Sequence, residues 1–127
     1  IITSATEHKS VLEPAKSCVR SKLRILKPGS KGNIAARDIN ENEIPAFTLV
    51  SLMHMNNETG TLNEINEIGQ KLRQFKCMDV FFHVDCVQSA GALPIKVHEM
   101  NADLVSVSSD KYRKKAESAF SERLTVR

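Results

Sequence analysis

Short apolar runs alternate with segments of helical period along this chain. The runs predict buried strands, because consecutive apolar residues suit a sheet that is covered on both faces. These predicted strands cover residues 1–2, 24–26, 47–53, 80–84 and 104–107. Apolar residues that recur every three or four positions predict helices instead. These predicted helices cover residues 9–23, 63–75 and 97–101, and the polar segment 38–43 is interpreted as one further short helix.

The order of these elements predicts the fold class. Strands separated by helices form crossover units, in which neighbouring strands run parallel and the helices cover the faces of the sheet. We therefore predict an α/β fold with a mostly parallel sheet and flanking helices. We also expect the first long helix to bury its apolar face against the sheet. That face consists of Val11, Leu12, Ala15, Val19 and Leu23.

Composition narrows the class of protein further. With 127 residues, of which 41% are hydrophobic and 26% are charged, the chain has the make-up of one globular domain. Its apolar runs are far shorter than the ~20 residues that cross a membrane. Its first residues also lack the charged and apolar regions of a signal peptide. We therefore expect a cytoplasmic protein with no membrane partner, and the missing initiator Met suggests a segment of a longer chain.

Cysteines and charges bear on two other classes, metal proteins and nucleic-acid-binding proteins. Cys18, Cys77 and Cys86 are an odd number at irregular spacing, which favours free thiols over a disulfide framework or a zinc site, and we expect no metal. The net charge of +3 arises largely from residues 111–127, which contain only two aromatic residues. Nucleic-acid-binding surfaces combine a basic stripe with aromatic side chains. We therefore expect no nucleic-acid partner.

Polar side chains follow four of the predicted strands at their carboxyl ends, where ligands bind in open parallel sheets. The set comprises Glu7, His8, His54, Asn56, Asn57, His83, Asp85, Gln88, Ser108, Ser109, Asp110 and Lys111. Taken singly, an aspartate after a strand is usually a cap or turn residue, and a lysine there is usually solvated. Together, a lysine amine, a carboxylate and nearby amides match the needs of pyridoxal phosphate. That cofactor attaches to a lysine and pairs its ring nitrogen with an acid.

Four sequence blocks at these strand ends resemble one known family. They cover residues 6–13 (TEHKSVLE), 49–60 (LVSLMHMNNETG), 82–91 (FHVDCVQSAG) and 103–111 (DLVSVSSDK). In this order and spacing the blocks resemble the cysteine desulfurases, the NifS-like enzymes of the class V aminotransferase group. The resemblance spans residues 1–112 and implies part of the large domain of a fold-type-I enzyme that uses pyridoxal phosphate. Residues 113–127 are interpreted as a divergent basic tail.

The resemblance implies a role for each of several residues. Lys111 would form the Schiff base with the cofactor, and Asp85 would be the partner of its pyridine nitrogen. Gln88 would donate a hydrogen bond to the ring hydroxyl. His8 would stack on the ring and help to move protons, and Asn57 would contact both the cofactor and the carboxylate of the substrate.

The remaining role and the other histidines complete these expectations. By the same resemblance, Ser108 would hold the phosphate group. The residues alone favour a plainer interpretation of His8, as a helix N-terminal residue with its ring in solvent. His54 is interpreted as a loop residue and His83 as a hydrogen-bonded residue near a strand end. His98 is interpreted as a surface residue of a helix.

The chain departs from the family pattern around the lysine. The family carries a phosphate-binding histidine where this chain has Asp110, whose negative charge would repel a phosphate. The family follows the lysine with a glycine-rich turn, but residues 112–118 contain neither glycine nor proline. Its upstream phosphate-binding segment would precede Ile1, and its nucleophilic cysteine and substrate-binding arginine would follow Arg127. We interpret Cys86 as a packing residue rather than as the persulfide carrier.

The implied activity is cleavage of the C–S bond of cysteine, which gives alanine and an enzyme persulfide. The sulfur would go to iron–sulfur cluster assembly or to thiolation of other acceptors, with sulfur-acceptor or scaffold proteins as partners and a homodimer as the full-length form. The isolated chain is expected to be inactive. Two alternatives stay open. One is a fragment of a selenocysteine lyase or another class V aminotransferase, and the other is a non-catalytic truncated interaction domain, which Asp110 and the altered tail favour.

Overall fold

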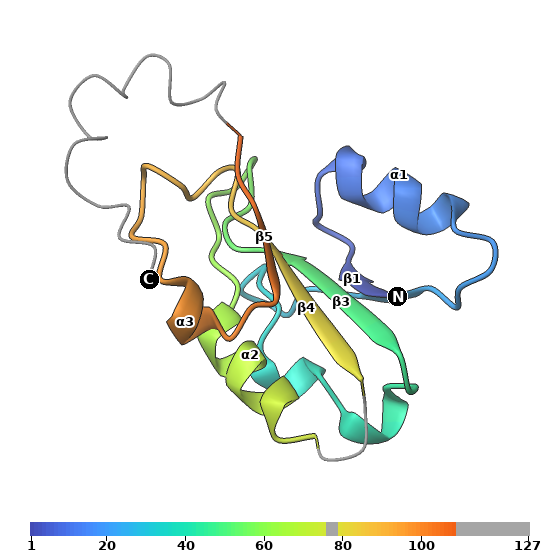
Figure 1. Cartoon of the computed structure of the whole chain (residues 1–127). Coiled ribbons are helices and arrows are strands. Elements are labelled where there is room, and N and C mark those ends of the chain that lie inside the picture. The colour runs from blue at the N-terminus through green and yellow to red at the C-terminus, as the bar shows by residue number, and fades with distance from the viewer. Residues whose placement is uncertain (76–78, 109–127) are drawn as a thin grey trace.

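The computed structural model describes residues 1–75 and 79–108 of the chain, and Figure 1 shows how their elements are arranged. The strands are β1 (Ile2–Ser4), β2 (Arg24–Leu26), β3 (Thr48–Met53), β4 (Val80–Asp85) and β5 (Leu104–Ser106). The α-helices are α1 (Lys9–Ser17), α2 (Ile65–Arg73) and α3 (Val97–Met100). Two turns of 3₁₀-helix, η1 (Ala36–Asp38) and η2 (Glu41–Glu43), complete the elements.

The five strands form one sheet in the order β2-β1-β3-β4-β5, and every neighbouring pair is parallel. The predicted α/β class with a parallel sheet is therefore confirmed. β3 and β4 form the longest pair, in register from Thr48 opposite Val80 to Met53 opposite Asp85. Because all strands point the same way, their carboxyl ends meet at one edge of the sheet.

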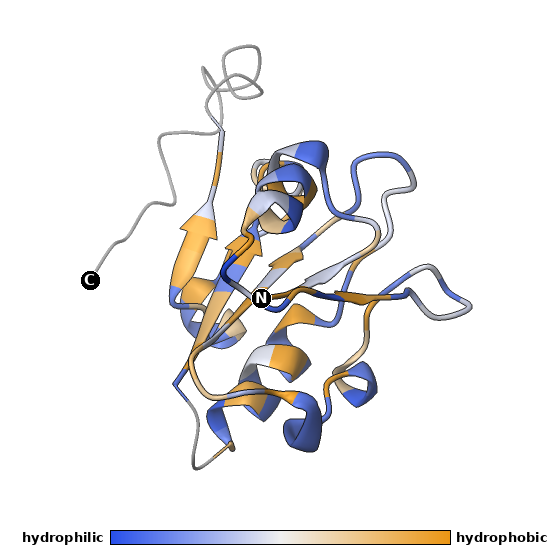
Figure 2. Cartoon of the chain, turned by 90° about the vertical axis from the view of Figure 1, so that its right-hand side faces the viewer, coloured by the Kyte–Doolittle hydropathy of each residue, from blue (hydrophilic) through white to orange (hydrophobic). Residues whose placement is uncertain are grey.

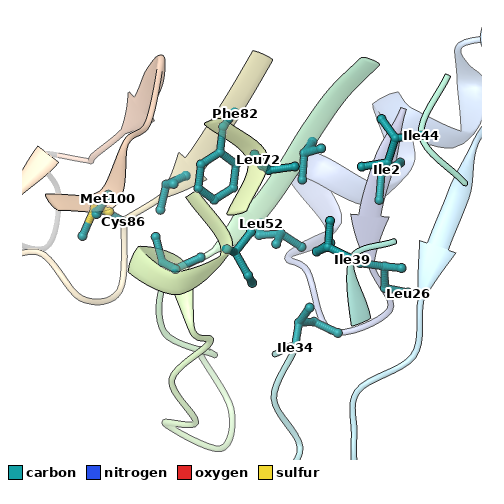
Figure 3. Close-up of a cluster of buried hydrophobic side chains, with 14 residues drawn as sticks. Ile2, Leu26, Ile34, Ile39, Ile44, Leu52, Leu72, Phe82, Cys86 and Met100 are labelled. Carbon is teal, nitrogen blue, oxygen red and sulfur yellow. The ribbon is translucent and has the colours of Figure 1, made fainter. Parts of the chain in front are cut away.

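The hydrophobic core lies between the sheet and α2. Val50 and Leu52 of β3 and Phe82 and Val84 of β4 face the helix from alternate positions of their strands, as the two-residue period of a strand requires. The core cluster is completed by Ile2, Leu26, Ile34, Ile39, Ile44, Ile65, Ile68, Leu72, Cys86 and Met100. Figure 3 shows most of these side chains packed between the strands and α2. The strands are mostly hydrophobic in Figure 2, whereas the helices carry both kinds of residue.

The α1 helix lies on the opposite side of the sheet from α2 and α3 (Figure 1) and is shorter than predicted. It ends at Ser17, although the apolar period predicted a helix to residue 23. Only Ala15 is buried in it, and Val19, assigned above to the buried face, is 93% exposed. Because Pro14 inside the helix cannot donate a backbone hydrogen bond, it also weakens this segment. Cys18 is therefore the residue that caps the end of α1.

The segment around residues 38–43 also differs from the prediction. Instead of one short helix it forms η1 and η2, with the buried Ile39 between them. The turns place Ile39 and Ile44 in the core. The other predicted elements are present with ends that shift by one or two residues, the usual uncertainty of helix and strand boundaries. Among the described residues, no helix is long and apolar enough to cross a membrane.

A glycine in the middle of α2 lets this helix approach α3 closely. Gly69 is buried, and a Cβ atom at this position would overlap the carbonyl oxygen of Met100 and lie 2.9 Å from its carbonyl carbon. Asn101, which ends α3 in the left-handed conformation with φ of 51°, lies next to this contact. The backbone of α3 therefore packs directly against the backbone of α2.

Candidate functional site

A cleft of about 320 Å³ opens at the carboxyl edge of the sheet. It is lined by His8, Ser10, Met53, Asn57, Asp85, Val87, Gln88 and Ser108. Five of the six predicted site residues thus lie around one cavity, although they come from four separate segments of the chain. The sixth, Lys111, lies outside the described residues, as do Asp110 and the predicted tail.

Asp85 is the last residue of β4 and is only 8% exposed. Its Oδ1 atom accepts a hydrogen bond of 2.9 Å from the backbone N–H of Val87, so the carboxylate also organises the turn that follows the strand. Within the described part of the chain, its other oxygen has no hydrogen-bond donor. A carboxylate with one anchored and one unpaired oxygen suits a cationic or N–H group in the cleft.

Hydrogen bonds of the buried residue Ser89 stabilise the turn that carries Gln88. Ser89 is fully buried, and its hydroxyl lies 2.9 Å from Nδ1 of His54 and donates to the carbonyl of Cys86 at 3.3 Å. The N–H of Ala90 donates to the same carbonyl at 2.8 Å. His54, interpreted above as a loop residue, therefore lies after β3 and supports this turn.

Cys86 follows Asp85 and packs into the core with no exposed surface. Burial raises the pKa of its thiol to about 11, an effect that a hydrogen bond with Ser89 partly offsets. The thiol is therefore protonated at neutral pH, and a protonated, inaccessible thiol is a poor nucleophile. This agrees with the prediction that Cys86 is a packing residue.

His8 caps the N-terminus of α1 and lines the cleft. Its Nδ1 accepts a hydrogen bond from the backbone N–H of Ser10 at 3.2 Å and lies 2.8 Å from the Ser10 hydroxyl. Because a backbone N–H can only donate, Nδ1 is unprotonated and the ring proton sits on Nε2. The capping role matches the plainer expectation for His8, and its position in the cleft wall is the one that a ring contact requires.

Asn57 stands in a loop that its neighbour organises. The Oδ1 atom of Asn56 accepts hydrogen bonds from the backbone N–H groups of Glu58 and Thr59, both at 2.9 Å. Its Nδ2 atom donates to the carbonyl of Thr6 at 3.0 Å. Asn56 thus ties the loop to the β1–α1 corner and leaves the exposed Asn57 side chain in the cleft wall.

Glu7 is a buried acid for which the sequence suggested no role. Its side chain is only 6% exposed. Its Oε1 atom accepts hydrogen bonds from Ser4 Oγ at 2.7 Å and from the Met53 N–H at 2.9 Å. Its buried Oε2 atom has no hydrogen-bond partner among the described residues. Burial raises the pKa of Glu7 to about 7, the two hydrogen bonds oppose the rise, and the negative charge of Asp85 adds to it. The polar residue type was visible in the sequence, but its burial depends on the packing of β1 against β3.

Glu7 is expected to make the chain less stable as the pH rises from about 4.5 to 7. In that range the unfolded glutamate has lost its proton while the folded one still holds it, so rising pH favours unfolding. The raised pKa corresponds to a loss of about 2 to 3 kcal/mol in the free energy of unfolding. Urea unfolding of the wild type and of Glu7→Gln across this pH range tests the prediction. The difference between their free energies of unfolding reports the titration of Glu7 alone, because the histidines are present in both proteins. A difference that does not change with pH would contradict the prediction.

His83 bridges three neighbouring strands on the face of the sheet away from α2. Its Nδ1 lies 2.8 Å from the hydroxyl of Ser51 in β3, and its Nε2 lies 2.8 Å from the hydroxyl of Ser106 in β5. Burial lowers the pKa of His83, while the Asp85 charge opposes that shift. His83 is thus hydrogen-bonded near its strand end, as predicted, and His98 is an exposed residue of α3, also as predicted. In the described ranges, no group of three or more His, Cys, Asp or Glu side chains is arranged to hold a metal ion.

Comparison with known proteins identifies relatives over most of the chain. The family model for class-V aminotransferases matches residues 1–113. Curated relatives include the cysteine desulfurase IscS of Shewanella sediminis, 43% identical over 113 residues that make up 87% of this chain and 27% of the relative. They also include the mitochondrial cysteine desulfurase of Eremothecium gossypii, 42% identical over 87% of this chain and 22% of the relative. The chain therefore spans about a quarter of the length of these relatives.

Solved structures with the same fold include a NifS-like protein, SspA and DndA. The structure of SspA in complex with cysteine superposes with a TM-score of 0.77 at 36% identity, covering 87% of this chain and 31% of SspA. The structure of DndA from Streptomyces lividans superposes with a TM-score of 0.70 at 38% identity, covering 85% of this chain and 30% of DndA. The fold of this chain thus has counterparts within larger proteins.

Proposed function

Because the chain belongs to the class-V aminotransferase family, we propose that it is the cofactor-binding segment of a cysteine desulfurase that uses pyridoxal phosphate. The observation that carries this proposal is the meeting of His8, Asn57, Asp85, Gln88 and Ser108 around one cleft. These side chains follow the ends of four parallel strands. Residues that are far apart in the sequence therefore meet at one place in the fold.

The residues of the cleft fit pyridoxal phosphate by their chemistry. The cofactor needs an acid at its ring nitrogen. Asp85 lies at the cleft wall with one carboxylate oxygen that has no hydrogen-bond partner among the described residues. It needs a flat group against its ring, donors for its ring hydroxyl and hydroxyl groups for its phosphate. The imidazole of His8, the amides of Gln88 and Asn57, and the hydroxyl of Ser108 are of these types. The cleft volume of about 320 Å³ lies within the range of small-molecule sites.

When bound, pyridoxal phosphate supplies an electron sink for bonds next to an amino group. Within this chain, Asp85 would keep a proton on the ring nitrogen, because a buried carboxylate stabilises a positive charge beside it. His8 would hold the ring face, and its protonated Nε2 would be available to a group in the cleft. Lys111 would be the point of covalent attachment, and Asn57 would orient the carboxylate of the substrate.

The relatives suggest the substrate of the full-length protein. The curated relatives described above are named cysteine desulfurases, and one matched structure is a complex with cysteine. We infer that the whole protein breaks the C–S bond of cysteine and transfers the sulfur to a protein thiol, which yields alanine and a persulfide. The persulfide would then serve sulfur-acceptor proteins in cluster assembly or thiolation, and the full-length form would be a homodimer.

Asp85→Asn is expected to weaken the affinity of the chain for pyridoxal phosphate by about 10-fold to 100-fold. The amide retains the size of the side chain but loses the charge that pairs with a protonated ring nitrogen, and a charged hydrogen bond contributes about 1.5 to 3 kcal/mol. Titration of the chain with the cofactor, followed by absorbance, measures this change. The exposed Glu13→Gln on α1 is the matched control, and it should bind as the wild type does.

Two results would decide against the proposed function. Equal affinities for the wild type and Asp85→Asn would show that the carboxylate does not contact the cofactor. No binding by the wild type would favour the non-catalytic interaction domain, the alternative that Asp110 and the altered tail support.

A further inference from the structure

The carboxyl group of Glu7 joins two walls of the cleft through a single atom. Its Oε1 accepts from the hydroxyl of Ser4, at the end of β1, and from the N–H of Met53, the last residue of β3. Met53 lines the cleft, and so does His8, which follows Glu7 directly in the chain. The carboxyl group therefore connects the corner that carries His8 to the strand that carries Met53.

His8 has no comparable link of its own. The described contacts of its ring are with Ser10, two residues further along the same corner, so they move together with it. Besides Glu7, the corner is linked to the residues after β3 by the hydrogen bond from Asn56 Nδ2 to the carbonyl of Thr6. That bond precedes Glu7 in the chain and reaches backbone only. The position of His8 relative to the cleft thus depends on how firmly Glu7 is held.

The unpartnered oxygen of Glu7 argues against a purely stabilising role. A buried oxygen without a hydrogen bond costs free energy, and an acid in this place is costlier than an apolar side chain of similar size. A residue that served only to fill space would avoid this cost. The carboxyl group provides one oxygen that accepts hydrogen bonds from both the Ser4 hydroxyl and the Met53 N–H. An apolar side chain could accept neither bond.

We propose that Glu7 is a positioning residue, which fixes His8 at the cleft by tying the β1–α1 corner to the end of β3. The inference rests on the proposed function in that it treats the cleft as the cofactor site. Glu7 itself need not touch the cofactor. It acts through the placement of the imidazole.

The first test needs no cofactor. The ring resonances of the four histidines are recorded by NMR and assigned by removing each ring in turn, beginning with His8→Ala. Glu7→Ala is expected to shift the His8 ring signals, because the corner loses its link to Met53. Glu7→Gln should leave them in place, because the amide oxygen still accepts both hydrogen bonds. Glu13→Ala, an exposed acid of α1 that pairs with Lys16, is the control and should also leave them in place.

The second test measures affinity for pyridoxal phosphate in a double-mutant cycle. Glu7→Ala is expected to weaken binding about tenfold when His8 is present, the equivalent of about 1.4 kcal/mol. In the His8→Ala background the same change should alter binding by less than twofold, because its effect is transmitted by the imidazole. A merely structural role would weaken binding equally in both backgrounds. Should Glu7→Ala fail to fold, Glu7→Asp replaces it, since the side chain is one methylene too short to reach both donors.

The outcomes separate this inference from the proposed function. Unchanged His8 signals in Glu7→Ala, or equal losses of affinity in both backgrounds, would overturn the positioning role even if the cofactor binds well. Shifted His8 signals in a chain that binds no cofactor would support the link between Glu7 and His8 and would contradict the proposed function instead.

Discussion

Lys111→Ala is expected to abolish the absorbance band that pyridoxal phosphate gives when it attaches covalently to the chain. Covalent attachment requires a primary amine within reach of the aldehyde group of the cofactor, and the alanine side chain has no amine. Lys111 follows β5 and Ser108 in the sequence, and Ser108 lines the cleft. It is the first lysine after Ser108 along the chain. We expect the loss of nearly the whole band, measured as absorbance at the edge of the visible range during titration with the cofactor.

Reduction with borohydride and peptide mass mapping makes this test specific. In the wild type the cofactor mass should appear on the peptide that contains Lys111. Lys16→Ala serves as the control, because Lys16 is an exposed lysine of α1 that pairs with Glu13, and its removal should leave the band intact. A band that persists in Lys111→Ala, or a label on another lysine, would contradict the assignment.

Gly69→Ala is expected to destabilise the chain by about 3 kcal/mol. Alanine in place of glycine normally stabilises a helix by about 1 kcal/mol, so the sign should be reversed here. The reason is the backbone of α3, whose Met100 carbonyl group occupies the space that the methyl group would need. Backbone cannot rotate away as a side chain can, so the two helices must separate and expose the core residues Ile68 and Leu72.

Urea or thermal unfolding of the variant measures this effect. Gln70→Ala, at the next position of α2 and exposed, is the matched control and should change the free energy of unfolding by less than about 0.5 kcal/mol. If Gly69→Ala were as stable as the wild type, α3 would have to be free to move, and the close contact between the helices would not be a fixed feature of the fold.

The sheet and the position of the cleft were predictable because both follow from local patterns. Apolar runs such as 80–84 mark strands wherever they are packed, and parallel strands place their carboxyl ends together by geometry alone. Asp85 and Asn57 could therefore be grouped from the amino-acid sequence alone. Their convergence on one cleft depends only on strand direction and order, which the alternation of strands and helices largely determines.

The misjudged features depend on contacts between distant segments. The apolar period continues through Val19, but nothing in the described chain covers that side chain, so the helix stops at Ser17. Glu7 could be placed among the polar residues that follow the strands, but only the pairing of β1 with β3 buries it beside the Met53 N–H. Periodicity reports which residues could be buried, whereas the packing partners decide which of them are.

The imidazole of His83 has a mechanical consequence for the cleft. β5 has three residues and lies at one edge of the described sheet, so its backbone pairing alone would fray easily. The imidazole of His83 in β4 is hydrogen-bonded to Ser106 of β5 and to Ser51 of β3, so it links β5 to both of these strands. Ser108 lies two residues after Ser106. Removing the imidazole of His83 would let Ser108 and its side of the cleft move away from Asp85, while the rest of the molecule kept its shape.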